Sequence, residues 1–138
     1  MKKALLIIAA LGIVLGASSL VAANTNWTGK YICMDQGIWK GTIYDDPTGP
    51  AKPYFKGKWV SMDVNKQGTM YASLKPDGYG NYKIIKGTLY DINGNEVGFW
   101  DGYFTLMVKP GHGEGAWAWI DAAYIGKWTG QLALTDEE

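Results

Sequence analysis

The chain has 138 residues, of which 47% are hydrophobic and 14% aromatic, and its thirteen lysines balance thirteen acidic residues without any arginine. Nucleic acid is therefore not an expected partner, because phosphate binding depends on clustered Lys and Arg, and these lysines are spread singly along the chain. Cys33 is the only cysteine, which excludes an internal disulfide, so the fold has to be held together by packing.

The first 23 residues have the layout of a secretory signal peptide. Lys2 and Lys3 form a basic start, and residues 4–23 form an uncharged, mainly apolar run that ends in small residues. We expect cleavage after Ala23 and a secreted or periplasmic protein. The alternative is a retained anchor, because 20 uncharged residues are just long enough to span a bilayer.

Residues 24–138 are expected to form a single domain. Removing 23 of the 138 residues leaves 115, which is about the usual size of one domain. Without Lys2 and Lys3, 11 lysines face 13 acidic residues, so the net charge of this part is about −2.

One five-residue pattern, apolar-x-small-x-apolar, recurs through the whole of this domain. The eight copies, two of them degenerate, occupy residues 27–31, 39–43, 55–59, 70–74, 85–89, 100–104, 113–117 and 128–132. The central residue is glycine in all copies but one, and the intervening positions are mostly Lys, Thr, Ser, Asp, Glu or Gln. Alternate side chains of a strand share a face, so each copy predicts a β-strand with aromatic and glycine residues on one side and lysines on the other.

Turn signals separate the copies. Asn93-Gly94 predicts a two-residue hairpin turn that needs positive φ, and segments rich in Pro and Gly at 45–50, 75–78 and 109–113 predict longer loops. The copies start every 12 to 16 residues, so each leaves room for one strand and one turn, and successive copies should be neighbouring strands.

These features predict an all-β fold, an antiparallel meander of seven or eight strands preceded by an N-terminal signal helix. The simplest form is a small up-and-down β-barrel, and a two-sheet β-sandwich is the alternative. Inward-facing glycines permit sharp bending and let neighbouring rings lie over the vacant side-chain positions, and closure removes the exposed strand edges.

The elements Gly57-Lys58-Trp59 and Trp39-Lys40-Gly41 resemble the Gly-x-Trp strand signatures of the calycin barrels, the avidins and lipocalins. The resemblance implies an eight-stranded barrel that binds a small ligand inside. The chain departs from the lipocalin pattern, because lipocalins are usually longer and close one barrel end with an arginine. No binding residue of these families is carried over to this sequence.

All seven tryptophans lie on the glycine-bearing face by strand parity. Inside a barrel these rings either fill the interior or line a cavity for an apolar or sugar-like ligand, and a flat exposed platform that stacks on polysaccharide is a third arrangement. A ligand-holding interior should contain a cavity above about 300 Å³. The predicted binding residues are Trp39, Trp59, Trp100, Trp117 and Trp128.

The predicted outer face carries apolar residues of its own, including Tyr71. Phe99, Tyr103 and Met107 share one predicted strand, and we interpret them either as a self-association surface or as residues packed under a loop or the N-terminal segment. The alternative function is therefore a structural, self-associating component of the cell envelope or extracellular matrix, a homo-oligomer. Cys33 is predicted to be a small buried side chain, with pairing between molecules as the alternative.

No residue pattern predicts catalysis. His112, the only histidine, lies in a Gly-rich turn, where a solvated role is expected, and nothing near it in the sequence supports a dyad with Cys33. The segment 91–96 offers oxygen ligands at alternate positions but lacks the later bidentate acid of a calcium loop. We therefore expect a protein that is not an enzyme, with no cofactor, no metal and, after signal cleavage, no membrane contact.

Overall fold

The computed structural model describes residues 24–33, 35–46, 48–62, 65–106, 111–122 and 125–133. The predicted signal segment and Met107 lie outside these ranges. The strands in the described ranges are β1 Thr25–Ile32, β2 Gly37–Tyr44, β3 Tyr54–Ser61, β4 Gln67–Pro76, β5 Asn81–Asp91, β6 Glu96–Trp100, β7 Tyr103–Thr105, β8 His112–Trp119 and β9 Gly126–Leu132. Within the same ranges, no helix has the length and apolar character needed to cross a membrane.

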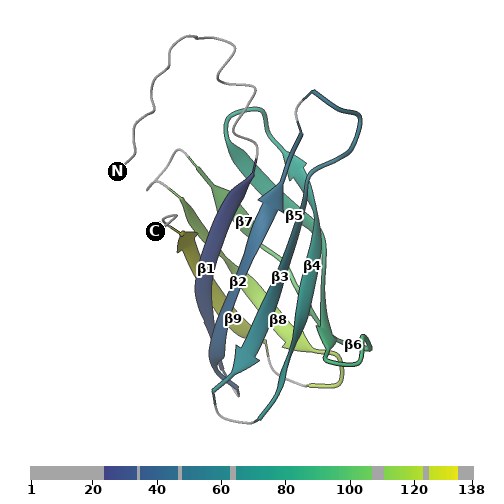
Figure 1. The fold of residues 1–138 in the computed structure, drawn as a ribbon. Helices are drawn as coiled ribbons and strands as arrows, with labels where there is room; N and C mark the ends of the chain where they lie inside the picture. The colour runs from purple at the N-terminus through teal and green to yellow at the C-terminus, as the bar shows by residue number, and fades with distance from the viewer. Residues whose placement is uncertain are drawn as a thin grey trace, which may run out of the picture.

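The strands form one closed antiparallel barrel (Figure 1). Strands β1 to β5 pair in chain order, β8 pairs with β9, and β1 pairs with β9 to join the two edges of the sheet. Strands β6 and β7 both pair with β5 and β8, so they share one position in an eight-position barrel, and Asp101-Gly102 separates them. The structure therefore confirms the predicted all-β up-and-down barrel.

The two ends of the barrel carry different sets of loops. The β1–β2, β3–β4, β5–β6 and β8–β9 connections lie at the lower end in Figure 1, and the β2–β3 and β4–β5 connections lie at the upper end. At the upper end the Tyr82 hydroxyl donates a 2.6 Å hydrogen bond to Asp45 Oδ2. Burial, together with this bond to the Asp45 carboxylate, raises the pKa of Tyr82 above its ordinary value.

Tryptophans and lysines lie on opposite sides of the sheet, as the alternation predicted. Six tryptophans are buried inside the barrel and Trp119 is half-buried. The lysines of the repeated strands point outward and are exposed, namely Lys30, Lys40, Lys56, Lys58 and Lys86. The barrel core is therefore aromatic and its outer wall is largely polar.

Glycines make room for the indole rings. Gly29 pairs with Gly130 across β1 and β9, and the Trp39 ring lies over both. A Cβ atom placed on Gly29 would lie 2.6 Å from Trp39 Cε2, much closer than an ordinary contact between carbon atoms. The inward glycines of most repeats thus permit the close approach of a ring, as predicted, whereas a Cβ at Gly102 would meet the backbone of Glu114 and Gly115.

The rings meet mostly edge to face. Trp39 and Trp100 each lie 5.5 Å from Trp128 between ring centroids, and Trp27 lies 4.9 Å from Phe104. Such pairs contribute about 0.5–1.5 kcal/mol each beyond the burial of their area. A network of these contacts stabilises the barrel without a disulfide.

The predicted orientation of Ile85 was wrong. Ile85 was expected inside the barrel, but it is the additional residue of a bulge between the pairs Ser73–Lys86 and Leu74–Ile84, and its side chain is 61% exposed. Ile84 takes the core position in its place.

The Asn93-Gly94 turn is longer than predicted. The Asp91 backbone NH donates to the Asn95 carbonyl, which closes a loop of Ile92, Asn93 and Gly94, and only Gly94 has positive φ, +88°. The Asp91 carboxylate accepts hydrogen bonds from the backbone NH groups of Asn93 and Asn95, which favours this longer loop over the two-residue turn.

Candidate functional site

The five predicted binding residues do meet inside the barrel. They line one small cavity together with four further side chains, Tyr31, Met70, Leu89 and Trp119. The cavity has a volume of about 30 Å³, which is enough for one water molecule. The rings therefore fill most of the interior, which does not contain the cavity above about 300 Å³ expected of a ligand-holding interior.

Backbone hydrogen bonds hold most of these indoles in place. Trp59 Nε1 donates to the Tyr90 carbonyl at 3.0 Å, and Trp128 Nε1 donates to the Asp101 carbonyl at 2.7 Å. Trp39 differs, because its Nε1 is buried and has no hydrogen-bond partner among the described residues. A buried donor without a partner is costly, so Trp39 is held by its ring packing rather than by a hydrogen bond.

A larger space opens at the lower end of the barrel. We call it the mouth cleft, and its volume is about 630 Å³. Trp59 and Trp119 form its aromatic part, with ring centroids 5.3 Å apart. The other lining residues are Asn65, Lys66, Gln67, Asp91, Ile92, Asn93, Val97, Ile120 and Asp121. This mixture of apolar and polar groups is typical of a small-molecule site.

Trp59 and Trp119 line both the mouth cleft and the interior cavity. Trp119 also packs edge to face on Trp117 with ring centroids 4.8 Å apart. The two indoles therefore form the partition between the cleft and the filled core.

The cleft carries charges of both signs. Lys66 Nζ lies 5.7 Å from the ring centroid of Trp119, within reach of a cation–π contact. At the end of the neighbouring strand β5, hydrogen bonds, foremost from the backbone NH of Asn95, hold the pKa of Asp91 below its ordinary value. The ionised Asp91 carboxylate accepts hydrogen bonds within its own turn. This turn structure explains why the segment 91–96 is rich in oxygen-bearing side chains.

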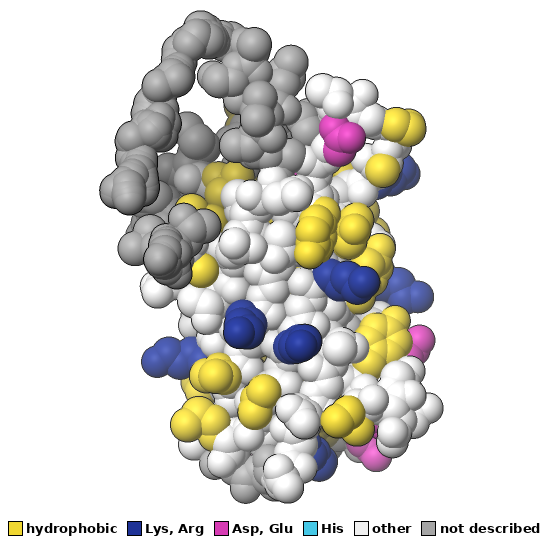
Figure 2. Space-filling model, in the orientation of Figure 1, with side chains coloured by type: hydrophobic (Ala, Val, Ile, Leu, Met, Phe, Trp, Pro, Cys, Tyr) yellow, Lys and Arg dark blue, Asp and Glu magenta, His cyan; other side chains and the backbone are white. Residues whose placement is uncertain are grey.

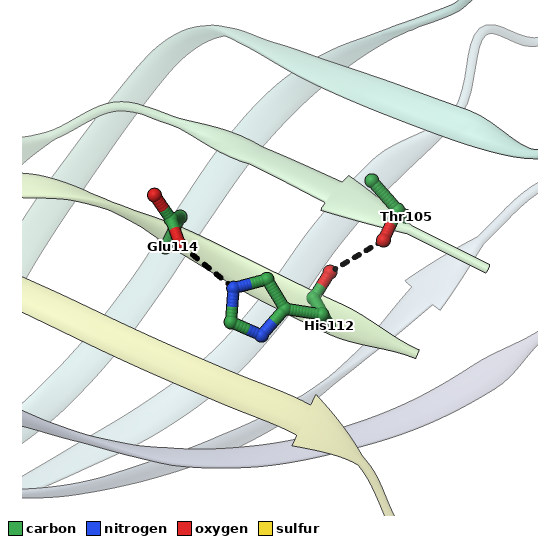
Figure 3. A network of polar contacts seen from close by, with 3 residues as sticks. All are labelled: Thr105, His112 and Glu114. Carbon is green, nitrogen blue, oxygen red and sulfur yellow. Dashed lines mark hydrogen bonds and ion pairs between the residues drawn. The ribbon is translucent and has the colours of Figure 1, made fainter. Parts of the chain in front are cut away.

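A polar network lies on the outer wall near the upper end (Figure 3). His112 Nε2 lies 2.8 Å from Glu114 Oε1, and the Thr105 hydroxyl donates to the His112 carbonyl at 3.2 Å. The pKa of Tyr103 on the neighbouring strand is raised, mainly because the phenol loses hydration and secondly because the negative charge of Glu114 lies close to it. His112 is the first residue of β8, so its predicted position in a turn was wrong by one residue.

No Cys33–His112 dyad forms. His112 pairs with Gln131, which pairs with Thr28, and Cys33 lies five residues beyond Thr28, just past the end of β1. At about 3.3 Å per residue, the offset along the strand direction alone is about 16 Å, which is too far for the two side chains to interact. Cys33 is also exposed, so its predicted burial was wrong.

The predicted self-association residues lie on the outer wall. Phe99 on β6 and Tyr103 on β7 are 45% and 41% exposed, and Met107 lies outside the described residues. Phe99 borders a shallow groove of about 330 Å³ that Ala118 and Ile125 also line. This surface is separate from the mouth cleft.

Comparison with protein-family models, curated proteins and solved structures finds no match to this chain. The kind of ligand that suits the cleft therefore has to be inferred from the residues that line it. Sequence reasoning named Trp59 but missed Trp119 and Lys66 as lining residues. Strand alternation places Trp117 and Trp119 on one face, so the sequence could have indicated Trp119 as a lining residue. Lys66 lies in a loop, where no residue pattern indicates which way a side chain points.

Proposed function

We propose that the protein binds a small ligand in the mouth cleft, against Trp59 and Trp119. One observation carries the proposal: a cleft of about 630 Å³ with an aromatic floor directly adjoins a core whose own cavity is about 30 Å³. Small-molecule sites commonly have this size, with apolar walls and a few polar groups that orient the ligand.

The lining of the cleft defines the ligand class. Val97, Ile92 and Ile120 supply aliphatic surface beside the two indoles, which suits an apolar or sugar-like ring. An anionic group on the ligand would give the Lys66 ammonium a stronger partner than the Trp119 ring, and it would leave that ring free to pack against the ligand.

Tryptophan fluorescence of the purified protein, titrated with a panel of sugars and lipids, tests this proposal. We expect a spectral change with at least one member, and a loss of affinity of about tenfold or more in Trp119→Ala, because central aromatic residues dominate binding sites. Tyr79→Ala is the matched control, since Tyr79 is 80% exposed in the β4–β5 loop at the other end. Absence of any response, or equal affinity of Trp119→Ala and wild type, would contradict the proposal.

Self-association through the outer wall is the second candidate function. It is supported by the filled interior and by Phe99 and Tyr103, which expose aromatic surface on adjoining strand segments. We expect Phe99→Ser to shift a sedimenting assembly toward the monomer if this surface binds a second copy. Large assemblies of the wild type, with no fluorescence response to any ligand, would favour this function over the first.

Either function would be carried out outside the cytoplasm. The basic start, apolar run and small residues before Asn24 support export, and we propose that residues 24–138 are the functional form. N-terminal sequencing of the protein from its host should find Asn24 first. A chain that begins at Met1 and remains in the membrane fraction would instead support the retained anchor.

A further inference from the structure

A lysine-rich face covers one half of the outer wall. The strands β1 to β4 contain no acidic residue, and β5 has only Asp91, at its last position. The same five strands carry seven lysines, Lys30, Lys40, Lys56, Lys58, Lys75, Lys83 and Lys86, all exposed. Figure 2 shows lysine side chains grouped over the middle of this face, and acidic side chains only toward its margin.

These lysines are not neutralised by neighbours. Lys40 lies directly opposite Lys58, and Lys75 lies directly opposite Lys83. Within the described ranges, no ion pair joins any of these lysines to an acidic group. Like charges placed opposite each other destabilise a sheet, so this arrangement has a cost that an external anion would relieve.

An aromatic stack adjoins the lysines. The rings of Tyr44, Tyr54 and Tyr71 stack across β2, β3 and β4, with centroids 5.1 and 5.7 Å apart and interplanar angles of 24° and 26°. Beside this stack, Lys56 and Lys58 line a shallow groove of about 600 Å³ together with Tyr71 and Thr69. The groove thus combines ammonium groups with phenol and hydroxyl groups.

We propose that this groove binds an acidic polysaccharide. A polymer with repeated carboxylate groups would engage several lysines of the face at once, and many weak contacts add to useful affinity. Nucleic acid suits the groove less well, because single-stranded binding needs open ring faces for base stacking. In this stack, both faces of Tyr54 and one face each of Tyr44 and Tyr71 are covered by a neighbouring ring. Their edges and hydroxyl groups remain available to sugar hydroxyls.

Affinity electrophoresis of the purified protein in polygalacturonate at low salt, with neutral dextran as the reference polymer, tests the proposal. We expect retention by polygalacturonate alone, and weaker retention as salt rises. The double variant Lys56→Gln/Lys58→Gln should lose about thirtyfold in affinity, since each lysine near an anionic surface contributes about 1 kcal/mol. Tyr71→Ser should lose a few-fold, which charge attraction alone would not produce.

The matched control is Lys52→Gln/Lys127→Gln, which removes the same charge from two exposed lysines that do not line the groove. Its affinity should stay within about twofold of wild type. Circular dichroism of each variant checks that the barrel is folded. No retention of the wild type, an equal loss in both double variants, or tighter binding to single-stranded DNA or anionic vesicles than to polygalacturonate would overturn the proposal.

Discussion

Replacing Gly130 by alanine should damage the barrel core more than its small size suggests. Gly130 lies under the ring of Trp39, and a Cβ there would lie 2.6 Å from Trp39 Cη2 and closer still to Cζ2. Carbon atoms in ordinary contact are about 3.5–4.0 Å apart, so the ring has to move by about 1 Å. Trp39 is 3% exposed and packs on Phe55 and Trp128, so it has little room for that shift.

The expected loss in the free energy of unfolding follows from the packing around Gly130. Overfilling a dense core costs about 1–3 kcal/mol, and a clash with a fixed indole belongs at the upper end of this range, about 3 kcal/mol. In urea, with a slope near 1.5 kcal/mol/M, the unfolding midpoint should fall by about 2 M. Gly78→Ala provides the comparison, because its Cβ meets nothing within 4 Å and only its φ of +84° is unfavourable. That change should cost about 1–2 kcal/mol.

A double-mutant cycle separates the clash from other effects. Trp39→Phe leaves a smaller ring above Gly130, so the Gly130→Ala change should cost clearly less in the Trp39→Phe background than in wild type. Unfolding by urea, followed by fluorescence and circular dichroism, measures all four proteins. A Gly130→Ala loss no larger than that of Gly78→Ala, or strict additivity of the two core changes, would refute the packing argument.

Three further predictions concern single groups. Tyr82→Phe should lower stability by about 1.5–3 kcal/mol, because it removes a hydrogen bond to the charged Asp45. Since the folded-state pKa of Tyr82 is raised, this difference should persist up to about pH 10 and fade at higher pH, where the phenol ionises in the unfolded chain but is still protonated in the folded protein. Asp91→Asn should lower the urea midpoint at pH 7, and the difference should shrink below about pH 4, because the lowered pKa of Asp91 stabilises the fold only while the group is ionised. The Cys33 thiol should react with Ellman's reagent in native buffer at a rate close to that of the unfolded chain, whereas slow reaction would show that it is covered.

The alternation of residue types along the chain was sufficient to predict much of the fold. Trp39 and Lys40 had to face opposite ways once both were in one strand, because side-chain direction in a strand is a local property with period two. The turn signals and the spacing of the copies similarly indicated neighbouring antiparallel strands, and the structure bears this out. Ile85 shows where local reasoning stops, since a bulge depends on how Ser73 and Leu74 pair across from it.

The two proposed binding surfaces depend on distances between strands, which no local pattern contains. The lysines are single in the sequence, yet the register of β2 and β3 places Lys40 opposite Lys58, and the pairing of β1 to β5 gathers the lysines on one charged face. Closure of the barrel fills the interior with rings and leaves the larger space at the mouth, beside Trp119 and Lys66. Strand alternation thus determines which side chains face the core and which face water. Register, curvature and loop packing determine which of them meet and how much volume remains between them, and these are properties of the whole barrel.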